Sequence, residues 1–393
     1  MGISQRMNDS LFEKAGALFR SHFGHPHSAA AYAPGRVEVL GNHTDYNEGF
    51  VLSAAIDRGT FFLARKSSSP ACRLLAGDVR EEARFPMGEI HPGTSQRWSN
   101  YVKGVVAQLR DRFGLTDGFE GLFLGNVPLG AGLSSSAALE ISTGLALARL
   151  YNVDVPPLEM ARIGQKAEHD FAGAKCGLLD QVTSLFGRQA ALVMTDFRTL
   201  AVESVPLGAE WCFLICNTAV KHSLVDSEYN ERRRRCEEAT LFFAGRLPHP
   251  VRALRDVSWD EFEAHRGAMD PITARRAAHV IGENTRVLKA RQLLTAGQVA
   301  EFGTLMFESH VSSQTNFENS CPELDRVVEA ARANPEVLGA RLSGGGFGGS
   351  VVLLAPPRSL PAVSSAISAA YKNSFGHACE IMTILPVAGA HIL

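Results

Sequence analysis

The spacing of hydrophobic and polar residues predicts strands and helices mixed along the chain. Short apolar runs typical of strands occur at residues 37–40, 50–56, 60–64 and 121–124. Stretches with the period of amphipathic helices lie among them, at residues 10–23, 98–113, 134–151 and 158–171. Because strands and helices do not alternate strictly, we expect an α+β fold rather than a doubly wound parallel sheet.

The second half of the chain continues this mixture with longer helices. The pattern predicts helices at residues 227–244, 275–296, 298–313 and 322–334, and a terminal strand pair at 351–354 and 380–386. A chain of 393 residues exceeds the usual size of one hydrophobic core, so we expect two lobes. The segment Asp196-Phe197-Arg198 has the composition of a turn, and we place the boundary near it, giving lobes of residues 1–205 and 206–393.

The composition is ordinary for a globular protein and excludes several kinds of partner. Hydrophobic residues make up 45% and the net charge is −2, so neither nucleic acid nor an acidic membrane is expected as a partner. No apolar run reaches the length of a membrane span, and the first residues lack a signal peptide's apolar stretch. Among seven scattered cysteines, Cys212 and Cys216 lie in a strand-like run, which favours buried free thiols. We therefore expect a cytoplasmic protein that is a monomer or a weak oligomer.

The most informative segment is a glycine- and serine-rich stretch at residues 126–138. It follows a predicted strand and leads into a predicted helix. Gly130 and Gly132 allow backbone N–H groups to point at one anion, and Ser134, Ser135 and Ser136 add hydroxyl donors at a helix N-terminus. The segment lacks the Gly-Lys-Ser/Thr of a P-loop and the glycine spacing of a dinucleotide fingerprint. It predicts a phosphate cradle; an ordinary helix cap is the alternative.

Two further segments are unusual. Residues 343–350 hold five glycines in six positions, including Gly345 and Gly346, which indicates close backbone approach to a ligand rather than a loose surface loop. Residues 35–47 follow a short strand with a dense row of polar side chains. Such groups recognise sugars, because each sugar hydroxyl needs donors and acceptors; a solvated loop is the alternative.

A fourth segment, at residues 168–181, contains two carboxylates suited to kinase chemistry. A kinase needs one oxygen ligand for Mg²⁺ and usually a second carboxylate near the acceptor hydroxyl. Glu168 and Asp180 could divide these two roles, although carboxylates on helices more often face solvent.

Together these segments resemble the GHMP kinase superfamily and, within it, the galactokinase family. The motifs occur in the family's order: Gly-Arg-Val-Glu-Val-Leu-Gly-Asn-His-Thr-Asp-Tyr, then Pro-Leu-Gly-Ala-Gly-Leu-Ser-Ser-Ser-Ala, then Gly-Gly-Gly-Phe-Gly-Gly. The resemblance implies a two-lobed fold with the active site in the cleft between the lobes. It also implies ATP-dependent phosphorylation of the anomeric hydroxyl of galactose, with Mg²⁺, so that the partners are a small sugar and Mg-ATP.

The resemblance also implies roles for individual residues. Asp180 is similar to the catalytic carboxylate beside the sugar's anomeric hydroxyl, and Arg36 to the cation that keeps it ionised. The positions similar to sugar contacts are Arg36, Asn42, His43, Asp45, Gly177, Asp180 and Tyr229. The positions similar to ATP contacts are Trp98, Gly130, Gly132, Ser134, Ser135, Ser136, Gly345 and Gly346. Ser136 and Glu168 are similar to the Mg²⁺ ligands.

The chain departs from the family pattern at one place. Galactokinases have Asn and then Glu where this chain has Glu38 and Asn42, so the two residue types have exchanged positions. We expect the two side chains to touch, since residues four apart on a strand face the same side. The exchange removes a carboxylate from the sugar end of the site, which questions a strict preference for galactose.

Other interpretations are compatible with the same fold. A kinase for another sugar (N-acetylgalactosamine, an arabinose or a uronic acid) is the first alternative. A catalytically silent sugar and ATP sensor is disfavoured by the intact Ser134–Ala137 run, and a mevalonate-type kinase by Tyr229. The run Arg232–Arg235 is interspersed with glutamates, which predicts a solvated helix face rather than an anion site.

Overall fold

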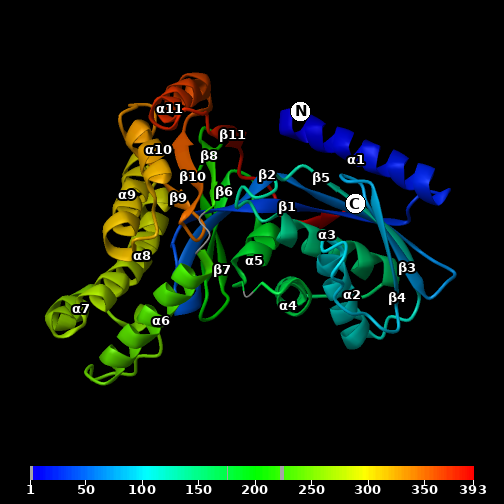
Figure 1. Ribbon diagram of the computed structural model, residues 1–393, viewed down its shortest axis with the longest axis horizontal. Coiled ribbons are helices and arrows are strands. Elements are labelled where there is room, and N and C mark those ends of the chain that lie inside the picture. The colour runs from blue at the N-terminus through cyan, green and yellow to red at the C-terminus, as the bar shows by residue number, and fades with distance from the viewer. Residues whose placement is uncertain (1–2, 175, 222–224) are drawn as a thin grey trace.

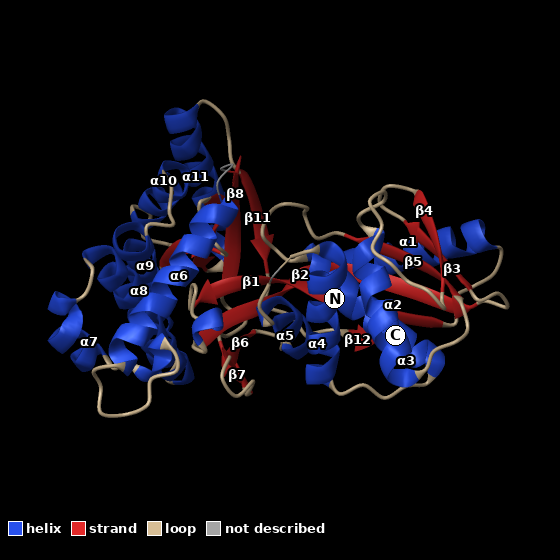
Figure 2. Ribbon diagram, turned by 60° about the horizontal axis from the view of Figure 1, so that its bottom comes forward, coloured by secondary structure: helices blue, strands red, loops and turns tan. Residues whose placement is uncertain are grey.

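The computed structural model describes residues 3–174, 176–221 and 225–393, and its first sheet contains most of the strands (Figures 1 and 2). Its main path has the order β12-β1-β2-β5-β3-β4, and β6 and β7 extend from β2. The strands are β1 (Ala29–Leu40), β2 (Phe50–Lys66), β3 (Ala71–Ala76), β4 (Glu81–Pro86), β5 (Phe119–Gly125), β6 (Ala191–Asp196), β7 (Val202–Pro206) and β12 (His391–Ile392).

Helices cover both faces of this sheet, which explains its continuous apolar runs. Phe61 and Leu63 of β2 pack against α1 (Ile3–Phe23), whereas Phe62 and Ala64 face the opposite layer. That layer consists of α2 (Ser99–Phe113), α3 (Ser135–Tyr151), α4 (Pro157–Ala167) and α5 (Leu179–Phe186), on the other side of the strands from α1 in Figure 1.

The second sheet has four strands in the order β11-β8-β10-β9. They are β8 (Cys212–Lys221), β9 (Gly339–Ser343), β10 (Gly348–Ala355) and β11 (Glu380–Ile384). The helices of this half are α6 (Val225–Ala244), α7 (Trp259–His265), α8 (Pro271–Thr295), α9 (Val299–Ser312), α10 (Pro322–Arg332) and α11 (Leu360–Phe375). Cys212 and Cys216 of β8 are fully buried free thiols, as predicted.

A shared apolar core joins the two sheets. Phe213 and Ile215 of β8 pack together with Leu40 and Leu52 of the first sheet and with residues of α8 and α9. Where the two sheets meet, the end of β1 approaches the second half of the chain, as Figure 2 shows. No helix among the described residues is both long and apolar enough to cross a membrane.

The α+β class is confirmed, and three element predictions are wrong in detail. The strands predicted at 351–354 and 380–386 form, as β10 and β11, but they do not pair with each other because β8 lies between them. Residues 50–56 and 60–64 belong to one strand, β2, which continues through the polar positions between them. The α-helix predicted at 158–171 ends at Ala167, and a π-helical turn, Glu168–Ala172, follows it directly. The sequence prediction also missed β3, β4, β6, β7, β9, β12, α7 and α11. The division into lobes at residues 205 and 206 stays a prediction.

Candidate active site

The loop of residues 41–50 (the 41–50 loop) connects β1 to β2 and is fixed by its own residues. Gly41 and His43 adopt the left-handed conformation, with φ of 101° and 60°. The Thr44 hydroxyl donates to the Gly41 carbonyl at 2.7 Å, and the Asn47 amide donates to the His43 carbonyl at 2.8 Å. These bonds give the side chains of the loop defined positions before any ligand binds.

His43 is a buried, neutral imidazole in this loop. Burial lowers its pKa to about 4. Its Nε2 lies 3.1 Å from the Gly345 carbonyl, which can only accept, so Nε2 carries the proton and Nδ1 accepts from the Tyr46 hydroxyl at 3.0 Å. The ring centroid lies 5.2 Å from that of Tyr229 and 4.5 Å from that of Phe317. Three predicted sugar or ATP residues (His43, Tyr229 and Gly345) therefore meet here.

Asp45 and Gly177 also meet, although they are far apart in the sequence. A Cβ atom at Gly177 would lie 2.6 Å from Oδ2 of Asp45, so only glycine leaves room for this carboxylate. Burial raises the pKa of Asp45 to about 6, and the nearby carboxylates of Glu38 and Asp180 act in the same direction. A buried, poorly solvated carboxylate of this kind can accept hydrogen bonds from hydroxyl groups.

Asp180 and Arg36 form the ion pair at the centre of the site. Asp180 lies in the first turn of α5, and its Oδ1 lies 2.7 Å from Nε and 2.6 Å from Nη2 of Arg36 on β1. Its Oδ2 accepts a hydrogen bond from the Ser134 hydroxyl. Nη1 of Arg36 donates to the Gly132 carbonyl at 2.6 Å. The pair thus contacts the glycine–serine loop (residues 126–136) directly.

The glycine–serine loop has the geometry of an anion cradle. Gly130, Gly132 and Ser134 all have positive φ, of 76°, 72° and 55°. Helix α3 begins at Ser135, and the Ser134 hydroxyl does not cap it, because that hydroxyl donates to Asp180. The first N–H groups of α3 therefore have no side-chain cap and are placed to bind a negative charge.

Ser136 and Glu168 lie together beside this helix start. The Ser136 hydroxyl hydrogen-bonds the Glu168 carboxylate, whose Oε2 also accepts from Gln181 at 3.2 Å. Burial raises the pKa of Glu168. A buried carboxylate beside a hydroxyl would supply two of the oxygen ligands that Mg²⁺ prefers. The described residues hold no cluster of three His, Cys, Asp or Glu suited to a metal.

The late glycine segment (residues 343–350) contacts both loops. The Gly344 carbonyl accepts a hydrogen bond from the Asn42 amide at 2.7 Å. Gly346 has a φ of 84°. The Ser350 hydroxyl donates to the Ala131 carbonyl of the glycine–serine loop at 2.9 Å. The segment therefore bridges the two predicted subsites: the carbonyls of Gly344 and Gly345 contact Asn42 and His43 of the 41–50 loop, and Ser350 contacts the glycine–serine loop.

Trp98 is not joined to these residues by any contact of the described chain. Its indole N–H donates to the Glu81 carboxylate at 2.8 Å, and its ring lies 5.4 Å from that of Phe123 on β5. It lies immediately before α2, at the edge of the first sheet. A place in the adenine pocket stays a prediction.

Glu38 and Asn42 touch, as predicted, although Asn42 lies beyond the end of β1, after Gly41 in the left-handed conformation. The Asn42 amide donates to Oε1 of Glu38 at 3.0 Å and, with its other hydrogen, to Gly344. Oε1 of Glu38 also accepts from Arg341 on β9, a fully buried arginine that the sequence prediction missed. Asn42 is only 1% exposed and its Oδ1 accepts from Asn319, so this amide is committed to the protein.

A second missed residue is the fully buried Glu283 of α8. Its Oε2 accepts from the backbone N–H groups of Gly41 and Asn42, at 3.0 and 2.9 Å. Its Oε1 accepts from Arg286 at 2.6 Å. The signal in the sequence is a charged side chain on the inward face of a helix with apolar neighbours.

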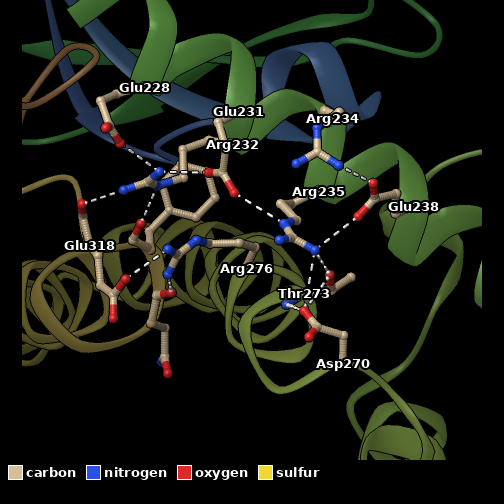
Figure 3. Close-up of polar contacts among 12 residues, drawn as sticks. Glu228, Glu231, Arg232, Arg234, Arg235, Glu238, Asp270, Thr273, Arg276 and Glu318 are labelled. Carbon is tan, nitrogen blue, oxygen red and sulfur yellow. Dashed lines mark hydrogen bonds and ion pairs between the residues drawn. The ribbon is translucent and has the colours of Figure 1, made fainter. Parts of the chain in front are cut away.

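The prediction of a solvated face for Arg232–Arg235 is wrong at its first residue. Arg233 and Arg234 are half exposed and pair with glutamates one turn along α6. Arg232 is only 6% exposed and lies in a polar network with Arg276 and Glu318 (Figure 3). The neighbouring glutamates suggested a solvated face, but Glu228 and Glu231 accept hydrogen bonds from the buried Arg232.

Family models match three parts of the chain. They are the GHMP kinases N terminal domain at residues 100–188, the GHMP kinases C terminal domain at residues 290–373, and the galactokinase galactose-binding signature at residues 17–66. The signature contains both β1 and the 41–50 loop. The N-terminal match contains the glycine–serine loop and Asp180.

Individual relatives agree with these models. The chain is 42% identical over 370 residues to a galactokinase of Pasteurella multocida, covering 93% of this chain and 94% of that protein. Its structure resembles that of Lactococcus lactis galactokinase complexed with galactose, with a TM-score of 0.91 and 33% identity over 97% of this chain and all of that one. Methanococcus jannaschii mevalonate kinase, at 18% identity and a TM-score of 0.61 over 92% and 98% of the two chains, shares the fold.

The motifs, the fold and the relatives agree over nearly the whole length, and the resemblance predicted from the sequence is confirmed. The chain belongs to the galactokinase family of the GHMP kinases.

Proposed function

We propose that this protein transfers the γ-phosphoryl group of ATP to the anomeric hydroxyl of galactose, giving galactose 1-phosphate and ADP. The observation that carries the proposal is the position of Asp180. Its carboxylate bonds to Ser134 of the glycine–serine loop, and the segment leading into its helix holds Gly177 against Asp45. A sugar held by Asp45 and a phosphate held at the start of α3 would meet at Asp180.

In this mechanism the chain's own residues position the reactants and manage the acceptor's proton. Asp45 accepts hydrogen bonds from ring hydroxyls, and the His43 ring, whose two nitrogens are bonded to Tyr46 and Gly345, packs against the sugar. Asp180 orients the anomeric hydroxyl and accepts its proton as the phosphoryl group transfers. Arg36 balances the charge of Asp180 and faces the charge that develops on the transferring group. Backbone N–H groups at Ser135 and Ser136 hold the phosphates.

Ser136 and Glu168 would hold Mg²⁺. When bound there, the ion would neutralise negative charge on the phosphates of ATP. We also propose that the protein acts in the cytoplasm on small molecules, a sugar and Mg-ATP; the seven cysteines, all free thiols, support a reducing compartment.

A second candidate, a 1-kinase for another sugar, is favoured by one observation. Asn42 stands where family members have glutamate, and its amide is bonded to Glu38 and Gly344. The sugar therefore meets no carboxylate at this point, and a hexose with a different substituent could be accepted there.

ADP release with Mg-ATP across a panel of free sugars tests both candidates, with Asp180→Asn as the control variant. We expect turnover on galactose, and a fall in kcat of at least about a thousandfold in Asp180→Asn with galactose binding kept. Turnover on another sugar and not on galactose would support the second candidate, a 1-kinase with a different substrate. Absence of turnover on every sugar, with ATP still bound, would overturn the proposal.

A further inference from the structure

Four consecutive arginines on α6 have different environments. The side chains of Arg233 and Arg234 are 50% and 55% exposed, and each is paired with a glutamate four residues on. The Arg232 side chain is only 7% exposed and points toward Glu318, as Figure 3 shows. Burying a guanidinium is costly unless its donors are satisfied, so the role of Arg232 should be apparent from what it bonds.

Arg232 binds the backbone of the turn that ends α9. Its Nε donates to the Phe317 carbonyl at 2.7 Å and its Nη2 to the Glu318 carbonyl at 2.9 Å. Its Nη1 donates to Glu228 and Glu231, which balance the charge. Most of its donors are thus engaged, and two of them hold successive main-chain carbonyls.

This turn needs external donors. It is a π-helical turn, Ser313–Phe317, followed by Glu318 in the left-handed conformation with φ 54°. The last carbonyls of a helix have no intrahelical partner. Arg276 of α8 binds the Asn316 carbonyl at 2.6 Å, next to the two carbonyls bound by Arg232. The two arginines therefore fix three successive carbonyls (Figure 3).

The fixed turn presents Phe317 to the predicted sugar site. The ring of Phe317 is fully buried, with centroids 4.5 Å from both His43 and His279, so it lies between the two imidazoles. The next residue but one, Asn319, donates to Asn42 at 2.9 Å and to the Gly345 carbonyl at 3.1 Å. The turn and the residues after it thus hold His43 and Asn42 of the 41–50 loop in place.

The same arginine reaches the site by two other routes. Its guanidinium lies over the ring of Phe347 in the late glycine segment, 5.3 Å from the centroid. Tyr229, whose ring lies 5.2 Å from that of His43, precedes Arg232 by three residues, so both project from one face of α6. One buried side chain thus joins three elements that surround His43.

We propose that Arg232 is a positioning residue of the sugar subsite, which holds Phe317 and the α6 face against His43. The inference rests on the proposed function, since it takes His43 as a sugar contact. Among the described residues, the hydrogen bonds and ring contact of Arg232 are with α6, the turn after α9 and Phe347, and none is with the glycine–serine loop, so its loss should affect the sugar far more than ATP. A merely structural role would instead lower stability and weaken both substrates alike.

The test is the Michaelis constants of Arg232→Lys and Arg232→Met for sugar and for ATP, with Arg234→Gln as the matched control on the same helix. Lysine keeps the charge but cannot bind two carbonyls with a planar fork. We expect KM for the sugar to rise about tenfold in Arg232→Lys and further in Arg232→Met, with KM for ATP within about twofold. Arg234→Gln should match the wild type.

A double variant tests the route through Phe317 and keeps the test decisive if Arg232→Met does not fold. Arg232→Lys should raise the sugar KM about tenfold in the wild-type background and less than about twofold when Phe317→Leu is already present. Equal effects on sugar and ATP, or full additivity with Phe317→Leu, would overturn the proposal. Failure of the proposed function would be seen separately, as a wild-type protein that turns over no sugar.

Discussion

The two loops that meet at Asp180 are built in opposite ways. The 41–50 loop is buried and bonded on every side: Glu283 of α8 accepts from the N–H groups of Gly41 and Asn42, and Asn284 accepts from that of Phe50 at 3.0 Å. The glycine–serine loop is open, with Leu129 84% exposed and empty space where a Cβ at Gly132 would lie.

The difference follows from the ligands that the loops are proposed to hold. A neutral sugar offers only hydroxyl groups, so its site must fix each donor and acceptor in advance. A triphosphate carries its own charge and binds backbone N–H groups, which must stay without protein partners until it arrives. One loop is therefore stabilised by the protein, whereas the other is completed by its ligand.

Removing the support under the 41–50 loop should give the largest effect. Glu283→Ala leaves two buried N–H groups and the Arg286 guanidinium without their acceptor, and we expect a loss of about 3–5 kcal/mol of stability. The control is Glu203→Ala, which breaks the exposed pair with Arg291 of the same helix, at 2.8 Å, and should cost less than about 1 kcal/mol. Urea unfolding of both variants measures the difference, and equal losses would contradict the comparison.

The pH dependence of the Glu283 contribution has a definite sign. Burial alone would raise the pKa of Glu283, but Arg286, His279 and Arg341 together outweigh it and the pKa falls to about 2. A carboxyl with a lowered pKa stabilises the folded state above its unfolded pKa and loses that contribution as the pH falls toward 2. The gap between wild type and Glu283→Ala should therefore narrow below about pH 4.5.

Exchanging Glu38 and Asn42 tests how tightly the 41–50 loop is specified. Asn42→Glu alone would place a carboxylate against the Gly344 carbonyl and the Glu38 carboxylate, which the amide now joins at 2.7 and 3.0 Å. We expect kcat/KM for galactose to fall about 30- to 100-fold, roughly 2–3 kcal/mol.

The double variant Glu38→Asn/Asn42→Glu restores the order found in relatives and keeps one carboxylate near Arg341. It should recover most of the loss, giving a coupling of about 1 kcal/mol or more in the double-mutant cycle. If Asn42→Glu leaves kcat/KM for galactose unchanged, position 42 does not determine sugar preference.

What the sequence predicted well is what depends on neighbours along the chain. The glycine–serine loop and α3 follow from local chemistry: glycines with positive φ, then a run of good helix formers. The same holds for the α2 helix and for the contact of Glu38 with Asn42, four residues apart.

What it could not predict depends on partners far away in the sequence. Arg341 meets Glu38 across 303 positions, and Gly344 meets Asn42 across 302. Arg232 lies in a stretch whose charges are typical of a solvated face, and only the docking of α6 on the end of α9 buries it. Local periodicity cannot reveal which helix face a distant element covers.

The smallest expected effect has the opposite sign, a gain of stability at the cost of activity. Asp45 is ionised at neutral pH at a cost, since burial raises its pKa to about 6. The folded protein therefore holds more protons than the unfolded chain between about pH 4 and 6, and stability falls as the pH rises through that window. The rise of about two in the pKa of Asp45 corresponds to a cost of about 3 kcal/mol at pH 7.5. Asp45→Asn removes this cost but buries an amide that needs its own hydrogen-bond partners, so we expect a gain of about 1–2 kcal/mol and a rise of about 1–2 °C in Tm.

The gain in stability of Asp45→Asn should depend on pH. This dependence shows whether the gain comes from removing the buried charge or from a change in side-chain packing. At pH 4.5 the wild-type carboxyl is largely protonated in the folded state, so the two proteins should melt at nearly the same temperature. The kcat/KM for galactose of the variant should fall at least about tenfold at pH 7.5, because an amide is a weaker acceptor for a sugar hydroxyl. A Tm of Asp45→Asn below that of the wild type at pH 7.5 would show that the Asp45 carboxylate stabilises the 41–50 loop. Its charge would then serve the folding of the loop rather than the binding of the sugar.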